Sequence, residues 1–205
     1  MKVFILAAGS QTRWNQEVLF PEFPIKQLVR ISSEELLLEH TVAQLRSRGI
    51  EPIIVSHLEA LRSYSTLSMI PSDNRYAVSS MMSTADAWSE LNVFLLGDVL
   101  YSEATLDTIL HAKGKIRFIG SKGEIYGVVF RDAVFAMEHL TATVHWADAN
   151  KDNRYCGKLW TLYRSVCGFP FDEHLFEKKR YLKRKDRITR DFDSQKEYAE
   201  WLKNQ

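Results

Sequence analysis

Near its start the chain reads Val3-Phe4-Ile5-Leu6-Ala7-Ala8-Gly9-Ser10-Gln11-Thr12-Arg13. The apolar part predicts a short buried β-strand, and the small residues after it let backbone amides approach a base or a phosphate group. In open α/β sheets, ligands bind at this carboxyl edge of the strands. Arg13 can neutralise phosphate oxygens with paired hydrogen bonds. The glycines of a dinucleotide fingerprint or a P-loop are missing, so a structural turn that ends in a solvated arginine explains the stretch about as well.

Four more short apolar runs follow and alternate with helical patterns. They lie at residues 53–55, 93–96, 116–119 and 125–130. Most are continuous rather than alternating, as expected for strands that are covered on both faces. The alternation of strands and helices predicts an α/β fold, a three-layer Rossmann-like mixed sheet, in a single domain over residues 1–205.

Capping residues and apolar stripes predict four helices. Their signals are, in chain order, the capping-box pair Ser32 and Glu35 with Gly49 as the stop, one face of Met81, Ala85 and Trp88, a start near Ser102, and the capping box of Ser194 and Glu197 before Tyr198, Trp201 and Leu202. The polar stretch 143–158 shows no such pattern, and we expect it to hold a long loop.

Composition limits the classes of function. The formal net charge of +1 on 205 residues predicts no general affinity for nucleic acid or for anionic membranes. Cys156 and Cys167 lack the close spacing of a zinc or redox motif, which favours reduced thiols. No apolar run is long enough to span a bilayer or to serve as a signal peptide, so we expect a cytoplasmic protein without a membrane partner.

Aspartates follow a buried run and precede the last helix. Asp98 comes directly after the run 93–96 and Gly97, where a carboxylate could hold Mg²⁺ against a phosphate group. Mg²⁺ takes one or two carboxylates from protein, and Asp191 and Asp193 could supply the second. Each aspartate by itself fits a turn or a helix N-cap about as well.

The order of these segments resembles the nucleotidyltransferases with a glycosyltransferase-A-like fold. They include sugar-1-phosphate nucleotidylyltransferases, phosphocholine cytidylyltransferases, the methylerythritol phosphate cytidylyltransferase and the molybdenum cofactor guanylyltransferase. The family opens with L-A-A-G-x-G-x-R and then P-K-x-L, and this chain has Leu6-Ala7-Ala8-Gly9 with Arg13, then Lys26-Gln27-Leu28. The resemblance covers nearly the whole chain at four spaced motifs. It departs at Gln11, which replaces the second glycine, and at Ile25, which separates Pro24 from Lys26.

The resemblance implies a site for a nucleoside triphosphate. The nucleotide-binding residues would be Leu6, Ala7, Ala8, Gly9, Ser10, Arg13, Lys26, Ser79 and Ser80. Arg13 and Lys26 would also be the catalytic cations, and Asp98 and Asp193 would hold Mg²⁺, the implied cofactor. Asp191 would support the metal site or face the acceptor.

The implied reaction moves a nucleoside monophosphate from the triphosphate to a small phosphorylated acceptor, such as a sugar 1-phosphate or a phospho-alcohol, and releases pyrophosphate. CTP or UTP is favoured because residues 74–81 are similar to the pyrimidine-using branch. Two alternatives stay open. The first is a glycosyltransferase of this fold, although such enzymes usually have Asp-x-Asp after the middle strand, where this chain has Gly97 and a single Asp98. The second is a catalytically silent nucleotide-binding domain, which would explain the departures at Gln11 and Ile25.

Two polar segments have competing interpretations. The basic run from Lys178 to Arg187 could bind nucleic acid, but a solvated helical arm is favoured because the net charge is nearly zero. The tract 146–154 could line an acceptor site or form an ordinary surface loop. Nothing in the sequence specifies an oligomeric state.

Overall fold

The chain is described here from a computed structural model. The structure describes residues 1–9, 11, 13–16, 18–121, 124–153, 156–173, 181–183, 186 and 188–205, with the backbone alone at 181–183.

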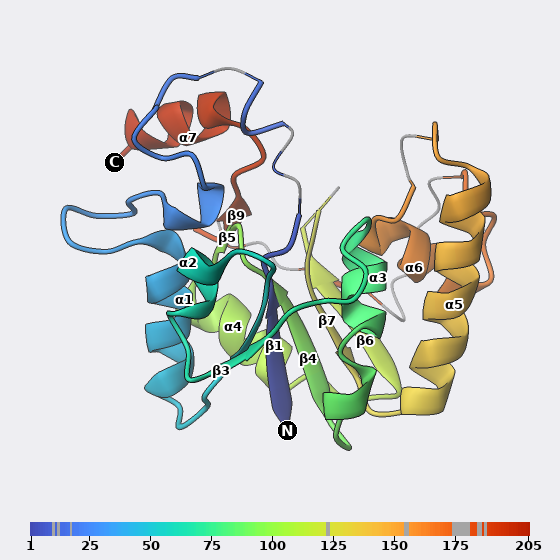
Figure 1. Cartoon of the computed structure of the whole chain (residues 1–205). Coiled ribbons are helices and arrows are strands. Elements are labelled where there is room, and N and C mark those ends of the chain that lie inside the picture. The colour runs from blue at the N-terminus through green and yellow to red at the C-terminus, as the bar shows by residue number, and fades with distance from the viewer. Residues whose placement is uncertain are drawn as a thin grey trace.

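A seven-stranded sheet forms the centre of the molecule (Figure 1). Its strands are β1 (Lys2–Leu6), β2 (Ile53–Val55), β3 (Leu67–Met69), β4 (Asn92–Leu96), β6 (Ile116–Gly120), β7 (Ile125–Phe130) and β8 (Tyr181–Lys183). Their order is β3-β2-β1-β4-β7-β6-β8, and among the described strands only β7 runs antiparallel to its neighbours. All five predicted strands are present, and the prediction of a mixed Rossmann-like sheet is confirmed.

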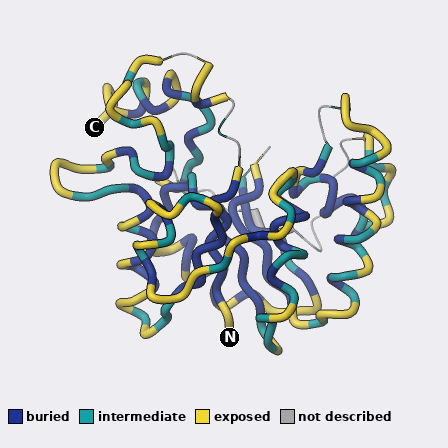
Figure 2. The backbone as a smooth tube through the Cα atoms, in the orientation of Figure 1, coloured by how far each residue is buried: buried dark blue, intermediate teal, exposed yellow. Residues whose placement is uncertain are grey.

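Helices cover both faces of this sheet. The helices on one face are α1 (Leu37–Arg46), α2 (Glu59–Arg62) and α4 (Glu103–Leu110). Those on the other face are α3 (Ala77–Met82), α5 (Ala133–Ala149) and α6 (Leu159–Cys167). Two buried clusters therefore enclose the strands from both sides, which is why the central strands are dark along their length in Figure 2 and why their apolar runs are continuous.

A third buried cluster lies beyond the carboxyl ends of β1 and β4, at the top of Figure 1. Tyr198 and Trp201 pack there against Trp14, and the Gln195 side chain accepts the backbone N–H of Leu19 at 2.6 Å. The last helix is thereby joined to the loop that follows β1. The elements of this region are η1 (Lys26–Leu28), α7 (Gln195–Leu202) and an antiparallel ribbon of β5 (Val99–Leu100) and β9 (Arg190–Asp191).

Capping signals in the sequence predicted the start of two helices correctly and of one helix wrongly. Ser102 caps α4, and Ser194 with Glu197 forms the predicted capping box of α7. The predicted box of Ser32 and Glu35 is wrong, because α1 begins at Leu37. The segment before it closes a turn instead, with a backbone bridge between Arg30 and Leu36, and the Ser32 hydroxyl accepts the N–H of Glu34 rather than that of Glu35.

Two further helix predictions are wrong. Met81, Ala85 and Trp88 do not share a helix, because α3 ends at Met82 and Ala85 opens a separate short turn, η2 (Ala85–Ala87). The Thr84 hydroxyl donates to the Met81 carbonyl and accepts from the Trp88 indole N–H, which stabilises the break. Leu202, expected to be packed, is 40% exposed.

The first part of the polar stretch 143–158 is the end of a helix rather than a loop, whereas its described residues 150–153 and 156–158 lie outside any helix, as the prediction of a loop requires. Helix α5 continues to Ala149 because Val144 and Ala147 extend the buried stripe that Ala136, Leu140 and Thr143 begin. The predicted helical arm at 178–187 is also wrong where the structure describes it. Tyr181–Lys183 forms β8, which pairs with β6, and of the rest of that run only Asp186 is described.

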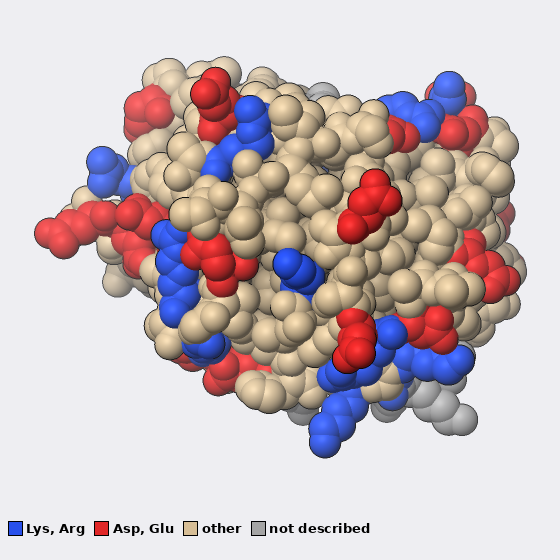
Figure 3. Space-filling model, turned by 60° about the horizontal axis from the view of Figure 1, so that its bottom comes forward, with Lys and Arg blue, Asp and Glu red and all other residues tan. Residues whose placement is uncertain are grey.

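Charges are mixed on the face drawn in Figure 3, which is the bottom of the molecule in Figure 1. Lys and Arg side chains stand there beside Asp and Glu side chains, in keeping with a formal net charge of +1. This face therefore lacks the broad basic surface that binds nucleic acid. Among the described residues, no helix has the length and apolar character needed to cross a membrane.

Candidate active site

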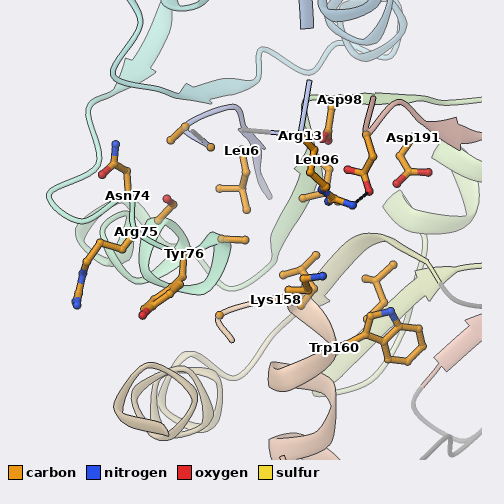
Figure 4. A pocket seen from close by; sticks show the side chains of 18 of the residues that line it. Leu6, Arg13, Asn74, Arg75, Tyr76, Leu96, Asp98, Lys158, Trp160 and Asp191 are labelled. Atoms are coloured by element: carbon orange, nitrogen blue, oxygen red, sulfur yellow. Dashed lines mark ion pairs between the residues drawn. The ribbon is translucent and has the colours of Figure 1, made fainter. Parts of the chain in front are cut away.

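A pocket of about 470 Å³ opens at the carboxyl ends of β1 and β4 (Figure 4). The loop after β1, the η1 turn, the start of α3, the end of β4, the turn before α6 and residues 191–193 all contribute to its lining. This is the edge at which open α/β sheets bind ligands.

The backbone brings Asp98 and Asp193 to the same end of this pocket. Gly97 lets the end of β4 approach β1, since a Cβ there would lie 3.1 Å from the Leu6 carbonyl oxygen. The β5–β9 ribbon then pairs Val99 with Asp191, and the Asp98 carbonyl accepts the N–H of the residue after Asp191 at 3.1 Å. Two segments far apart in the sequence therefore lie side by side.

Two cations join the aspartates. The Lys26 ammonium donates to the Asp98 carboxylate, and its Nζ lies 3.9 Å from Oδ1 of Asp193. The Arg13 guanidinium pairs with Asp193 from the other side. Lys26 is the fixed member, with a side chain only 13% exposed, whereas Arg13 is 59% exposed and free to turn toward a ligand.

The pKa of Lys26 lies above its ordinary value. Burial by itself would lower it, but the charge and hydrogen bond of Asp98 outweigh burial, and Asp193 adds to the effect. Lys26 therefore remains a charged ammonium at neutral pH. In that form it binds anions and does not act as a nucleophile or a base.

The acidic side chains raise one another's pKa. Burial, then Asp193 and Asp98, raises the pKa of Asp191 to about 6. Burial, followed by the charges of Asp191 and Asp193, raises the pKa of Glu124 to about 7. The pKa of Asp193 is raised by burial although Arg13 and Lys26 oppose the shift. This end of the pocket therefore concentrates negative charge that a further cation would stabilise.

The donor set fits Mg²⁺. Asp98 and Asp193 offer hard carboxylate oxygens on two sides of one cationic nitrogen, and both lie beside the opening of the pocket. Within the described residues no group of three or more His, Cys, Asp and Glu side chains is arranged to hold a metal. Mg²⁺ requires only one or two carboxylates, since water and substrate phosphates complete its shell.

The other predicted nucleotide-binding residues are placed differently from one another. Leu6, Ala8, Gly9 and Ser80 line the pocket. Ala7 is buried in the core on the α1 side of the sheet, and the Ser79 hydroxyl is engaged with the backbone of Tyr76 at the start of α3. Ser10 lies outside the described residues.

Sequence reasoning singled out residues 74–81 for their similarity to the pyrimidine-using branch but did not predict the wall that Tyr76 forms opposite the aspartates. The Tyr76 ring lies against Gly157, where a Cβ would come within 2.1 Å of the ring and where φ is +66°. Arg75 stacks over Tyr76 at 5.5 Å and pairs with Asp73 and Asp148. The sequence feature that could have indicated this wall is the pair Gly157-Lys158, which lies inside the stretch predicted as a loop.

Cys156, Lys158 and Trp160, which are near Gly157 in the sequence, also line the pocket. They follow the tract 146–154, which the sequence analysis named as a segment that could line an acceptor site. No described residue of that tract lines the pocket, and Asp148 instead pairs with Arg75 at the pocket's outer margin.

The sequence matches no family model and no curated protein. Solved structures do share the fold. A protein of Aquifex aeolicus VF5 superposes with a TM-score of 0.59 at 16% identity, over 80% of this chain and 82% of that one. The CTP:phosphocholine cytidylyltransferase of Streptococcus pneumoniae gives 0.54 at 15% identity, over 98% and 97%.

A nucleotidyl transferase from Methanothermobacter thermautotrophicus also gives a TM-score of 0.54, at 18% identity over 68% of this chain and 74% of that one. At such low sequence identity, the structural similarity shows that the chains share a fold and shows nothing more. The chain has the nucleotidyltransferase fold that its spaced motifs predicted.

Proposed function

We propose that this chain is a Mg²⁺-dependent nucleotidyltransferase that moves a nucleoside monophosphate from a triphosphate to a small phosphorylated acceptor. The observation that carries the proposal is the meeting of Arg13, Lys26, Asp98 and Asp193 at one end of a single pocket. A fixed lysine and a more exposed arginine beside two carboxylates can receive a polyphosphate and its metal together.

The residues support direct transfer. A phosphate oxygen of the acceptor, ionised at neutral pH, attacks the α-phosphorus, the bond from the α-phosphorus to the bridging oxygen breaks, and pyrophosphate leaves with that oxygen. Lys26, held in place by Asp98, would stabilise charge on the α-phosphate, and the more exposed Arg13 would follow the leaving pyrophosphate. Mg²⁺ held by Asp98 and Asp193 would neutralise and orient the phosphate oxygens.

Two substrates are proposed, a nucleoside triphosphate and a phosphorylated acceptor. CTP and UTP come first among the triphosphates, because the likeness to a CTP:phosphocholine cytidylyltransferase extends over 98% of the chain. A sugar 1-phosphate or a phospho-alcohol is the proposed acceptor. Its body would lie between Asp191, Glu124 and Trp160, which line the side of the pocket beyond the aspartates.

The test is pyrophosphate release from each of the four ribonucleoside triphosphates with Mg²⁺ and a panel of phosphorylated acceptors. Lys26→Ala and Arg13→Ala should each lower turnover by about a hundred- to a thousandfold, the usual effect of removing one charge contact to a transition state. Lys115→Ala is the matched control, because that lysine is 72% exposed at the start of β6, on the opposite edge of the sheet.

Full activity in a folded Lys26→Ala variant would contradict the proposal. Consumption of nucleotide sugars without any reaction of triphosphates would favour the glycosyltransferase alternative. Triphosphate binding without turnover, detected as a raised melting temperature, would favour a silent binding domain.

A further inference from the structure

The backbone of Gln11 is held in an unfavourable conformation. Its φ of 56° makes it the only residue other than glycine, among those the structure describes, with a positive φ. This left-handed region is costly for a residue that carries a Cβ, and such residues persist where the surrounding structure holds them. Some contact of Gln11 must therefore offset the cost.

That contact is with the backbone of Lys26. The Gln11 side-chain oxygen, Oε1, accepts the Lys26 N–H at 2.9 Å. Lys26 opens the η1 turn, and Ile25 before it provides no side-chain cap. The first N–H groups of a helical turn have no partner within the turn, so Gln11 supplies from the β1 loop the acceptor that this turn lacks.

The bond joins the two segments that carry the cations of the site. Arg13 lies two residues beyond Gln11, and the Lys26 side chain extends from the turn that Gln11 caps. Arg13 pairs with Asp193, and Lys26 contacts Asp98. A glycine at position 11 would adopt the same φ at no steric cost but would leave the Lys26 turn untethered.

We propose that Gln11 is a positioning residue that fixes the Lys26 turn against the loop of Arg13, so that both cations face one bound polyphosphate. The role rests on the nucleotidyl transfer proposed above. Gln11 acts through Lys26 and does not need to contact substrate. An error of about 1 Å in the placement of a catalytic group can lower the rate by up to about a hundredfold, so a tether at this point controls turnover.

Two variants of equal side-chain length separate the hydrogen bond from packing. Gln11→Met keeps the length and loses the acceptor, whereas Gln11→Glu keeps an acceptor oxygen. The Met variant should lower kcat by about tenfold or more, and its Lys26 amide should exchange with solvent about fivefold faster by NMR. The Glu variant should keep kcat and amide protection but raise KM for the triphosphate, because the added charge repels phosphate.

Gln11→Gly is the second acceptor-free variant, and it also removes the backbone strain. It should melt near the wild-type temperature, because the relief of strain offsets the lost hydrogen bond, and still show the lower kcat, so a folding defect in Gln11→Met cannot hide the effect. Wild-type kcat or wild-type exchange of the Lys26 amide in a folded Met or Gly variant overturns the proposal. A wild-type protein that is inactive toward every triphosphate defeats the proposed function instead, while the amide exchange still decides whether the tether exists.

Discussion

The two walls of the pocket are built in opposite ways. One, called the phosphate wall after the function proposed for it, consists of Arg13, Lys26, Asp98 and Asp193, which come from four segments and are joined by charge. The other, the aromatic wall, consists of the Tyr76 ring packed on the backbone of Gly157, with Lys158 between them and Trp160 in Figure 4.

Under the proposed function, this difference predicts that one wall carries out the reaction and the other recognises the substrate. Removing one member of a partly buried charge network leaves its partner without compensation and disturbs every other group in the network. Removing shape from an aromatic surface changes how a ligand fits but leaves distant charges in place. We therefore expect changes in the phosphate wall to act on kcat and changes in the aromatic wall to act on KM and on stability.

The largest expected effect is at the aspartates. Asp98→Asn and Asp193→Asn should each lower turnover by about a hundred- to a thousandfold and raise the Mg²⁺ concentration needed for half-maximal rate. They should also weaken the rise in melting temperature that Mg²⁺ with a triphosphate causes in the wild type. Asp107→Asn is the control, since that carboxylate is exposed on α4 and pairs only with Arg48 among the described residues. If the metal dependence of Asp193→Asn were unchanged, Asp193 would not be a ligand of the metal.

A smaller effect is expected from alanine substitutions at two glycines that share a backbone conformation. Gly157 and Gly168 have φ values of +66° and +73°, but a Cβ at 157 would strike the Tyr76 ring, and one at 168 would meet nothing within 4 Å. Gly168→Ala should cost about 1–2 kcal/mol of unfolding free energy. Gly157→Ala should cost a further 1–3 kcal/mol or so for overpacking.

Urea unfolding measures the stability of both variants, and steady-state kinetics measures their effect on the site. Only Gly157→Ala should raise KM for the triphosphate, with kcat nearly unchanged, because Tyr76 shifts while Lys26 and Asp98 stay in place. Equal effects of the two substitutions, or a fall in kcat without a change in KM, would contradict the division between the walls.

The smallest expected effect concerns Asp186, which anchors the segment leading to Asp191 and Asp193. Its carboxylate accepts the hydroxyls of Ser102 and Thr105 at the start of α4 and the N–H of Thr189 at 2.7 Å. Burial would raise its pKa, but these hydrogen bonds outweigh burial and hold the pKa well below 3.8.

A carboxyl group whose pKa is lower in the folded state stabilises the protein above its ordinary pKa, and that contribution is lost as the pH falls through the folded value. Asp186→Asn should therefore lower the unfolding free energy by about 1–3 kcal/mol at pH 7 and by progressively less below pH 4 or so. The measurement is urea unfolding of both proteins between neutral and acidic pH. A difference that does not shrink in acid would show that Asp186 acts by packing rather than by charge.

The sheet was predictable because its strands are covered on both faces. A strand such as β2 or β7 must be apolar at every position, so a short continuous run marks it with its ends nearly correct. Helix boundaries were less predictable. Ser32 and Glu35 have the spacing of a capping box, yet the bridge from Arg30 to Leu36 places them in a turn, and local spacing does not reveal such a competing pairing.

Three residues of the phosphate wall follow a recognisable local signal, while the resemblance to nucleotidyltransferases implied their roles and pointed to Lys26. Arg13 follows a strand and small residues, Asp98 follows a buried strand and Gly97, and Asp193 precedes a capping box. The aromatic wall gave no comparable signal. Tyr76 and Gly157 acquire their roles only from contact with one another, and polar, small and aromatic residues near 143–158 suit many surface segments equally well.

The sequence by itself determined the layered α/β fold, because strand burial, strand ends and helix caps are local properties of the chain. Its spaced motifs pointed to the four charged residues that meet at one end of the pocket. Tertiary structure alone decided the rest. The β5–β9 ribbon sets Asp193 beside Asp98, Gln11 caps the turn of Lys26, and the ring of Tyr76 covers Gly157. Each of these depends on a contact between residues distant in the sequence, and such contacts form only when packing of the whole core fixes where their segments lie.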